Sequence, residues 1–279
     1  MALTAEYDIS PPQAVQLADD LTTLIACACA EITAISQQAA IPRLKSDQSP
    51  VTAADEASEA VILRGLSNLL PGIPVISEES APTKMPSGLS SFIIVDPLDG
   101  TREYIAGRDE FSVNLAIVTG GVPIAGFIAA PGRGQLWRGV IGYGAERLRL
   151  LAKGADQSQP ISTRHWPDAP AVAVVSRSHL DPDTQAFINA LGPLTRVASG
   201  SAIKFCRIAE GSADVYPRLA TTCEWDVAAG HALVAAAGGS VMTPQGTPLS
   251  YGRAAENFRV PAFVAWGDPA KAAAMKSRF

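Results

Sequence analysis

The sequence predicts a mixed α/β (α+β) fold with two lobes, and two patterns along the chain support this prediction. In the first half, two segments with a helical period of apolar residues accompany a series of short apolar runs, which is typical of helices packed on a largely antiparallel sheet. In the second half, strand-like and helical segments alternate, which is typical of an α/β lobe. We therefore expect a tail over residues 1–12, an α+β lobe over 13–158 and an α/β lobe over 159–279.

The first helix has a recognisable start. Ser10, Pro11 and Gln13 supply an N-cap, a first-turn proline and a side chain that can reach back to the cap. Apolar residues from Leu17 to Ile35 then follow a helical period, and we expect Pro42 to stop the helix.

The other expected elements follow from apolar runs bounded by turn residues. A second helix is expected from Thr52 to the Pro71-Gly72 pair. Strands are expected at 73–76, 92–95, 111–118 and 122–130, with two more within 135–151, and Thr119-Gly120-Gly121 is a hairpin signal. In the second half, strands are expected near 171–175, 194–198 and 214–216, and helices near 182–191, from Ser201, and at 226–237.

Composition excludes several classes of protein. The formal net charge of −5, without a block of Lys and Arg, argues against a nucleic acid polymer as partner. The four cysteines form no C-x-x-C pair and no spacing typical of disulfides, which indicates a reducing compartment. The chain shows no signal peptide and no apolar run of roughly 18 residues, so we expect no transmembrane segment and a cytoplasmic protein.

Carboxylates gather at the ends of apolar runs. Asp96-Pro97-Leu98-Asp99-Gly100-Thr101 follows one expected strand, Glu78-Glu79 follows another, and Glu224-Trp225-Asp226 precedes a helix. Carboxylate oxygens with backbone carbonyls between them are the ligands that hard divalent cations such as Mg²⁺ prefer. The sequence therefore predicts a metal-dependent enzyme that acts on a phosphorylated substrate.

Each of these acidic residues also has a purely structural interpretation. Asp96 to Gly100 fits two common surface turns, Asp226 is a favoured helix N-cap, and Thr52-x-x-Asp55 fits a capping box. The structural and catalytic roles are compatible for Asp226 and Asp55. On a strand Glu78 and Glu79 would point in opposite directions, so we favour Glu78 as the metal ligand.

Cations are needed because a phosphate monoester beside three or four carboxylates is strongly repelled. Two or three Mg²⁺ ions offset this repulsion and activate a water molecule for in-line attack on phosphorus. The contexts of the serines and cysteines suggest no covalent nucleophile.

The motif Asp96 to Thr101, together with Trp225-Asp226-x-Ala228-Ala229-Gly230, resembles the paired signature of the inositol monophosphatase-like, lithium-sensitive phosphatases. The run Asp99-Gly100-Thr101-Arg102-Glu103-Tyr104-Ile105 is more similar to the CysQ type, the 3′(2′),5′-bisphosphate nucleotidases. Four further segments, 49–55, 176–179, 200–206 and 216–218, resemble the same type. The resemblance implies the layered αβαβα sandwich of the sugar-phosphatase (inositol monophosphatase/fructose bisphosphatase) type.

The resemblance also implies roles for individual residues. The implied Mg²⁺ ligands are Glu78, Asp96, Leu98 through its carbonyl, Asp99 and Asp226. Asp55 and Thr101 position the attacking water, and we place Glu79 with them in the catalytic set. The expected substrate-binding residues are Glu78, Leu98, Asp99, Gly100, Thr101, His179, Gly200, Ser201, Lys204, Arg218 and Asp226.

The expected reaction is Mg²⁺-dependent hydrolysis of the 3′-phosphate of adenosine 3′,5′-bisphosphate (PAP) to AMP and phosphate. The resemblance extends this to 3′-phosphoadenylyl sulfate (PAPS) and to a role in sulfur assimilation. One alternative is an inositol monophosphate or fructose bisphosphate phosphatase, and another is a non-catalytic nucleotide or metal sensor. The first lobe would hold the metals and the second the substrate, as one catalytic unit. Oligomeric state and peripheral association with the inner face of the membrane stay open.

Overall fold

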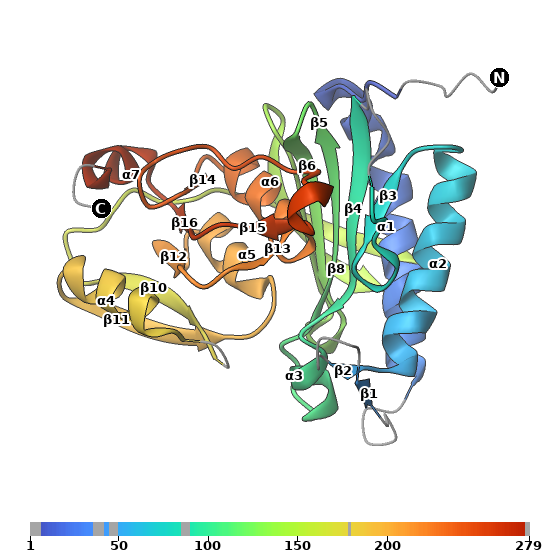
Figure 1. The fold of residues 1–279 in the computed structure, drawn as a ribbon, viewed down its shortest axis with the longest axis horizontal. Helices are drawn as coiled ribbons and strands as arrows, with labels where there is room; N and C mark the ends of the chain where they lie inside the picture. The colour runs from blue at the N-terminus through green and yellow to red at the C-terminus, as the bar shows by residue number, and fades with distance from the viewer. Residues whose placement is uncertain (1–6, 36–41, 45–49, 85–89, 178–179, 277–279) are drawn as a thin grey trace.

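The computed structural model describes residues 7–35, 42–44, 50–84, 90–177 and 180–276. Figure 1 shows five layers, in the order helices, sheet, helices, sheet, helices. This arrangement confirms the expected αβαβα sandwich. The central helical layer packs against both sheets.

The first sheet has seven strands in the order β3-β4-β5-β6-β7-β8-β9. Only β3 and β4 are parallel, and the other neighbours are antiparallel, so the expected antiparallel sheet is confirmed. The Gly120-Gly121 turn, with φ of 59° and 76°, joins β5 to β6 as the hairpin signal predicted. The strands are β3 Val75–Ser77, β4 Ser91–Asp99, β5 Ser112–Thr119, β6 Val122–Ala130, β7 Gln135–Val140, β8 Gly144–Leu151 and β9 Gly154–Ile161.

Two helices, α1 (Pro11–Ala34) and α2 (Ala53–Leu69), cover the outer face of this sheet. The predicted capping of α1 is confirmed, because the Gln13 side chain accepts a hydrogen bond from the Ser10 N–H at 2.8 Å. Two boundaries differ from expectation. The helix starts inside the expected tail 1–12, since prolines in its first turn need no N–H partner. It ends at Ala34, before Pro42, because Ile35 has an extended backbone.

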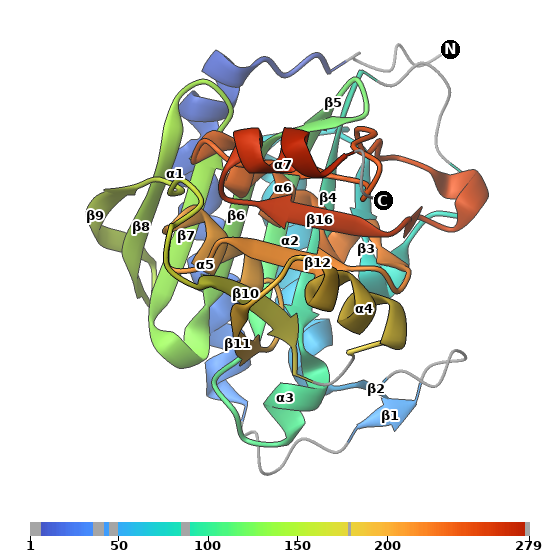
Figure 2. The same ribbon diagram turned by 90° about the vertical axis from the view of Figure 1, so that its left-hand side faces the viewer.

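The second sheet has five strands in the order β11-β10-β12-β16-β14. Helices α5 (Ile203–Ala209) and α6 (Ala228–Ala236) lie between the two sheets, and α4 (Pro182–Ala190) and α7 (Pro269–Met275) cover the outer face, in front in Figure 2. The division at 158/159 stays a prediction, and β9 runs through it. The strands are β10 Ala171–Ser176, β11 Leu194–Ser199, β12 Val215–Arg218, β14 Ser240–Met242 and β16 Phe263–Trp266.

Short elements complete the fold. They are β1 Arg43–Leu44, β2 Pro50–Val51, α3 Thr101–Ile105, β13 Thr222–Cys223, β15 Arg259–Val260, and the 3-10 turns η2 Glu78–Ser80, η3 Pro131–Arg133, η4 Glu224–Asp226 and η5 Ala254–Glu256. Among the described residues, no helix combines the length and the apolar character that crossing a membrane requires.

The close approach of α6 to the first sheet depends on Gly126 in β6. A Cβ at this position would lie 2.1 Å from the backbone oxygen of Ala229 in α6. We expect Gly126→Ala to lower the free energy of unfolding by about 2 kcal/mol, because the helix backbone must move. Chemical denaturation measures this value. Gly267→Ala is the matched control, since its Cβ would meet atoms only at 3.4 Å or more, and an equal loss there would contradict the prediction.

Candidate active site

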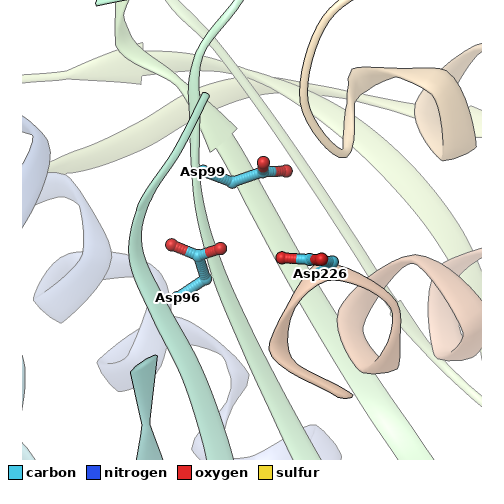
Figure 3. Close-up of side chains that lie close together, drawn as sticks. All are labelled: Asp96, Asp99 and Asp226. Carbon is cyan, nitrogen blue, oxygen red and sulfur yellow. The ribbon is translucent and has the colours of Figure 1, made fainter. Parts of the chain in front are cut away.

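Three carboxylates meet between the end of β4 and the start of α6. Asp96 and Asp99 come from β4, Asp226 comes from η4, and oxygens of the three lie within 4.8 Å of one another (Figure 3). The pairing of β4 with β5 shifts register between Asp96 and Asp99, where Pro97 has no N–H to donate. This irregularity turns two carboxylates of one strand toward a third from the other half of the chain.

Asp96 is the most deeply buried of the three. Its Oδ1 accepts a hydrogen bond from the Leu98 N–H at 3.0 Å, whereas its Oδ2 is buried without a partner. Burial, together with the charges of Glu78, Asp99 and Asp226, raises the pKa of Asp96 well above its ordinary value. A buried oxygen without a donor, facing further carboxylates, fits a site built for a cation with oxygen ligands.

Neighbouring residues determine the charge of the Asp99 carboxylate and the orientation of the Asp226 carboxylate. Burial and the charge of Asp226 raise the pKa of Asp99 to about 6, although Lys204 and Asn114 oppose this rise. Asp226 accepts hydrogen bonds from the Thr222 hydroxyl and, at 3.3 Å, from the Cys223 N–H. These bonds hold the Asp226 carboxylate opposite β4 before any ligand binds.

Two adjoining cavities open at this cluster, and they share Asp99, Gly100, Glu103 and Asp226. We call the larger one, of about 150 Å³, the acidic cavity; it is lined by Pro50, Glu78, Asp96, Leu98, Asp99, Gly100, Thr101, Arg102, Glu103 and Asp226. We call the smaller one, of about 70 Å³, the cationic cavity; it is lined by Asp99, Gly100, Glu103, Ser176, Gly200, Ser201, Lys204, Tyr216, Arg218 and Asp226.

Asp55 at the start of α2 has both contacts that the sequence suggested. Its Oδ2 accepts from the N–H and the hydroxyl of Thr52, at 2.8 and 2.6 Å, which is the predicted capping box. Its Oδ1 accepts from the Thr101 hydroxyl at 3.1 Å, across 46 positions of sequence. Burial raises the pKa of Asp55, against the hydrogen bonds from Thr52 and Thr101. One carboxylate therefore links a helix cap to the acidic cavity.

Positive charge lies on the other side of Asp99 and Asp226. Lys204 is buried, donates to the Ser201 carbonyl and lies 5.3 Å from the centre of the Tyr216 ring. Ser201 has a left-handed backbone with φ of 45°, which is unusual for a residue with a side chain. The pKa of Arg218 is raised; burial opposes the rise, but Tyr216, Asp226 and Asp99 outweigh it.

The structure brings most of the predicted site residues together, and it corrects two local predictions. Asp226 does not cap α6, whose N-cap is Val227, and it accepts hydrogen bonds from Thr222 and Cys223 instead.

Glu78 and Glu79 directly follow β3, as expected, but they lie in the 3-10 turn η2, so the alternation of side chains along a strand does not separate them. Glu78 lines the acidic cavity, whereas Glu79 is not among its lining residues. A catalytic role for Glu79 stays a prediction. His179 lies outside the described residues.

Two acidic residues at the site were not among the predicted site residues. Glu103 lines both cavities. Glu110 is buried and accepts a hydrogen bond at 3.2 Å from the N–H of Gly200, which lines the cationic cavity. The sequence offers little reason to predict a role for Glu110 in the site, because an acidic residue before an apolar strand is common. Its partners lie up to 90 positions away in the sequence.

Residues 12–272 match the model of the inositol monophosphatase family. The chain belongs to this family, which is the class that the layered fold and the acidic site define. Within it, the chain is 41% identical over 221 residues to the 3′(2′),5′-bisphosphate nucleotidase CysQ of Escherichia coli strain K12, covering 78% of this chain and 86% of that protein. It is 30% identical to the CysQ of Haemophilus influenzae, over 81% of this chain and 83% of that protein.

Solved structures agree with these matches. The crystal structure of CysQ from Bacteroides thetaiotaomicron superimposes with a TM-score of 0.74 at 36% identity, covering 89% of this chain and 97% of that one. An inositol monophosphatase of Thermotoga maritima reaches a TM-score of 0.75 at 19% identity, covering 94% and 97%, which supports the fold alone. The family is metal-dependent, in agreement with the carboxylate cluster of Asp96, Asp99 and Asp226.

Proposed function

We propose that this protein hydrolyses the 3′-phosphate of adenosine 3′,5′-bisphosphate (PAP) to AMP and phosphate in the presence of Mg²⁺. The observation that carries the proposal is the pair of adjoining cavities with a common wall at Asp99 and Asp226. The acidic cavity suits a phosphate that arrives with cations, and Lys204 and Arg218 in the other cavity suit further negative charge on the same molecule. The resemblance to CysQ proteins supports a nucleotide bisphosphate as that molecule.

Glu78, Asp96, Asp99, Asp226 and the Leu98 carbonyl would hold the metal, which we propose to be two or three Mg²⁺ ions. When bound, these ions would supply a nucleophilic water and neutralise charge on the phosphate and the leaving oxygen.

Asp55 and Thr101 would orient the attacking water. The Thr101 hydroxyl donates to Asp55 Oδ1 and, at 3.2 Å, also has the Leu98 carbonyl within reach. A hydroxyl held by a carboxylate in this way presents its lone pairs to the cavity, where they can accept a hydrogen bond. The raised pKa of Asp55 makes the carboxylate a better proton acceptor than an exposed aspartate.

Phosphate release from a panel of substrates tests the proposal. PAP, PAPS, inositol 1-phosphate and fructose 1,6-bisphosphate are compared at equal concentration with Mg²⁺, with and without Li⁺. We expect kcat/KM for PAP to exceed that for inositol 1-phosphate by at least about 100-fold, because inositol 1-phosphate has no second phosphate for the cationic cavity. Fructose 1,6-bisphosphate has two phosphates, so a preference for PAP over this substrate tests whether the site selects a nucleotide. Hydrolysis of PAPS would support a role in sulfur assimilation.

The other results of this panel distinguish the alternatives. A preference for inositol 1-phosphate or fructose 1,6-bisphosphate would overturn the substrate assignment and leave the metal site in place. Binding of PAP without any phosphate release would indicate a non-catalytic sensor. The water-positioning pair Asp55 and Thr101 argues against a sensor, since binding alone does not require it.

A further inference from the structure

Glu110, two residues before β5, contacts glycines on both sides of the active site. Its side chain is buried, and its backbone oxygen lies close to Gly100 and Gly200. A Cβ at Gly200 would lie 2.7 Å from this oxygen, and a Cβ at Gly100 would lie 3.1 Å from it. Gly100 belongs to the wall shared with the acidic cavity, and Gly200 lines only the cationic cavity. The chain around Gly100 and the chain around Gly200 therefore both contact Glu110.

The Glu110 carboxylate makes polar contacts with three segments. Arg177, which follows β10, donates from Nε to Oε2 at 2.7 Å and from Nη2 to Oε1 at 3.1 Å. Arg133 of η3 donates to Oε1 at 3.1 Å, and the Gly200 N–H donates to Oε2 at 3.2 Å. Burial opposes ionisation, but these donors and the two guanidinium charges hold the pKa of Glu110 below its ordinary value. The side chain is thus a fixed anion that joins both sheets to the Gly200 loop.

The Gly200 loop carries residues that line the cationic cavity. Ser201 follows directly, in a left-handed backbone conformation that costs free energy unless its surroundings impose it. The Ser201 carbonyl in turn accepts from Lys204. The bond from Gly200 to Glu110 anchors the residue before this strained position, so it also bears on where the Lys204 ammonium lies.

We propose that Glu110 is a positioning residue whose carboxylate fixes the Gly200 loop, and with it the phosphate-binding groups at Ser201 and Lys204, relative to the acidic wall at Asp99-Gly100. This inference rests on the proposed function of the site. Among the residues that the structure describes, the hydrogen bonds of the Glu110 carboxylate go to Arg133, Arg177 and Gly200 and not to the metal cluster. Loss of Glu110 should therefore weaken substrate binding and leave the dependence of activity on Mg²⁺ unchanged.

Glu110→Gln tests the proposal in the full-length protein. The amide keeps an acceptor but loses the charge that holds Arg177 and Arg133, so the loop is less firmly fixed. We expect KM for PAP to rise about tenfold, the scale of one charge-assisted hydrogen bond, at unchanged half-saturating Mg²⁺. Glu110→Asp keeps the charge but falls short of the Gly200 N–H. It should show a similar rise in KM with a smaller loss of thermal stability, and it provides the test if Glu110→Gln does not fold.

Glu210→Gln is the matched control. Glu210 is also a partly buried carboxylate, held by the Trp137 indole N–H at 2.6 Å and by Arg147 at 3.3 Å, but it lies at the far end of α5 from the cavities. We expect this variant to lose stability with KM unchanged. Calorimetric binding of inorganic phosphate with Mg²⁺ present gives the same comparison without turnover.

Unchanged KM and phosphate affinity in both Glu110 variants would overturn the positioning role, as would a parallel change in half-saturating Mg²⁺. Failure of the proposed function is a separate result, because it shows in the wild-type protein. If the wild type prefers another substrate of the panel, the same ratios are measured with that substrate. If it hydrolyses none of them, the calorimetric affinities decide.

Discussion

Replacement of Asp96 by asparagine is expected to lower kcat by roughly 10³-fold, the upper range for removing one electrostatic contact from a desolvated site. The same replacement should make the metal-free protein more stable. Asp96 Oδ2 is buried without a donor, and Glu78, Asp99 and Asp226 repel its charge. An amide of the same size removes this repulsion, keeps an acceptor for the Leu98 N–H and offers donors to the neighbouring carboxylates.

Two measurements check this prediction. Steady-state rates with saturating substrate and Mg²⁺ give kcat, and thermal unfolding with and without a chelator gives stability. We expect Asp96→Asn to raise the free energy of unfolding of the metal-free protein by about 1–3 kcal/mol, the cost of a buried unsatisfied group. The stabilisation that Mg²⁺ gives the wild type should be largely lost.

Asp156→Asn makes the same chemical change in an exposed ion pair with Arg149 on β8, away from both cavities. It should alter neither kcat nor the response to Mg²⁺, since exposed ion pairs contribute little. Near-normal turnover in Asp96→Asn would overturn the assignment of metal ligands. A less stable metal-free variant would show that the unpaired oxygen is not a source of strain.

The features predictable from the sequence are those encoded by neighbouring residues. The caps at Ser10 and Thr52 need only residues within one turn, and the Gly120-Gly121 hairpin needs only two positive φ angles. Asp96 and Asp99 also lie in one short motif. Their approach to Asp226 was expected because each segment has carboxylates where an apolar run meets a turn or helix, and the resemblance to a family then assigned them to one set of metal ligands.

Other features depend on tertiary contacts and could not be predicted in this way. Glu78 and Glu79 were expected to point in opposite directions, as on a strand, but after β3 the chain turns into η2 beside the acidic cavity. Glu110 is recognisable only once Arg133, Arg177 and Gly200 surround it, from 23 to 90 positions away. The surroundings of Glu78 and of Glu110 both arise from the packing of the two sheets on a common helical layer.

The second large effect concerns Asp55, whose two oxygens separate a structural role from a catalytic one. Oδ2 receives the hydrogen bonds of the capping box from Thr52, and Oδ1 receives that of the Thr101 hydroxyl. Replacing Asp55 itself would remove both roles at once. Replacing each threonine removes the hydroxyl that donates to one of the two oxygens, and the Thr52 backbone N–H still donates to Oδ2, so the two variants form a matched pair.

Thr101→Val is expected to lower kcat about 100-fold, the lower range for losing one participant in proton transfer, with little change in stability. Valine has nearly the same shape and removes only the hydroxyl that reaches Asp55 and the Leu98 carbonyl. Thr101→Ser restores that hydroxyl and should recover most of the lost rate. Thr52→Ala should do the opposite, costing about 1 kcal/mol of stability through the lost cap while kcat stays within a fewfold.

Rates and denaturation midpoints of the three variants decide between two interpretations of Asp55. If Thr52→Ala lowers kcat as much as Thr101→Val, the capping box itself orients the catalytic group, and the roles of the two oxygens are not separable. If Thr101→Val retains its rate, Asp55 is a helix cap whose position beside the cavity is incidental. The expected opposite effects would show that the Asp55 carboxylate caps α2 with Oδ2 and supports catalysis with Oδ1. This double role explains why Asp55, although only 1% exposed, contacts the hydroxyl of Thr101, which lines the acidic cavity.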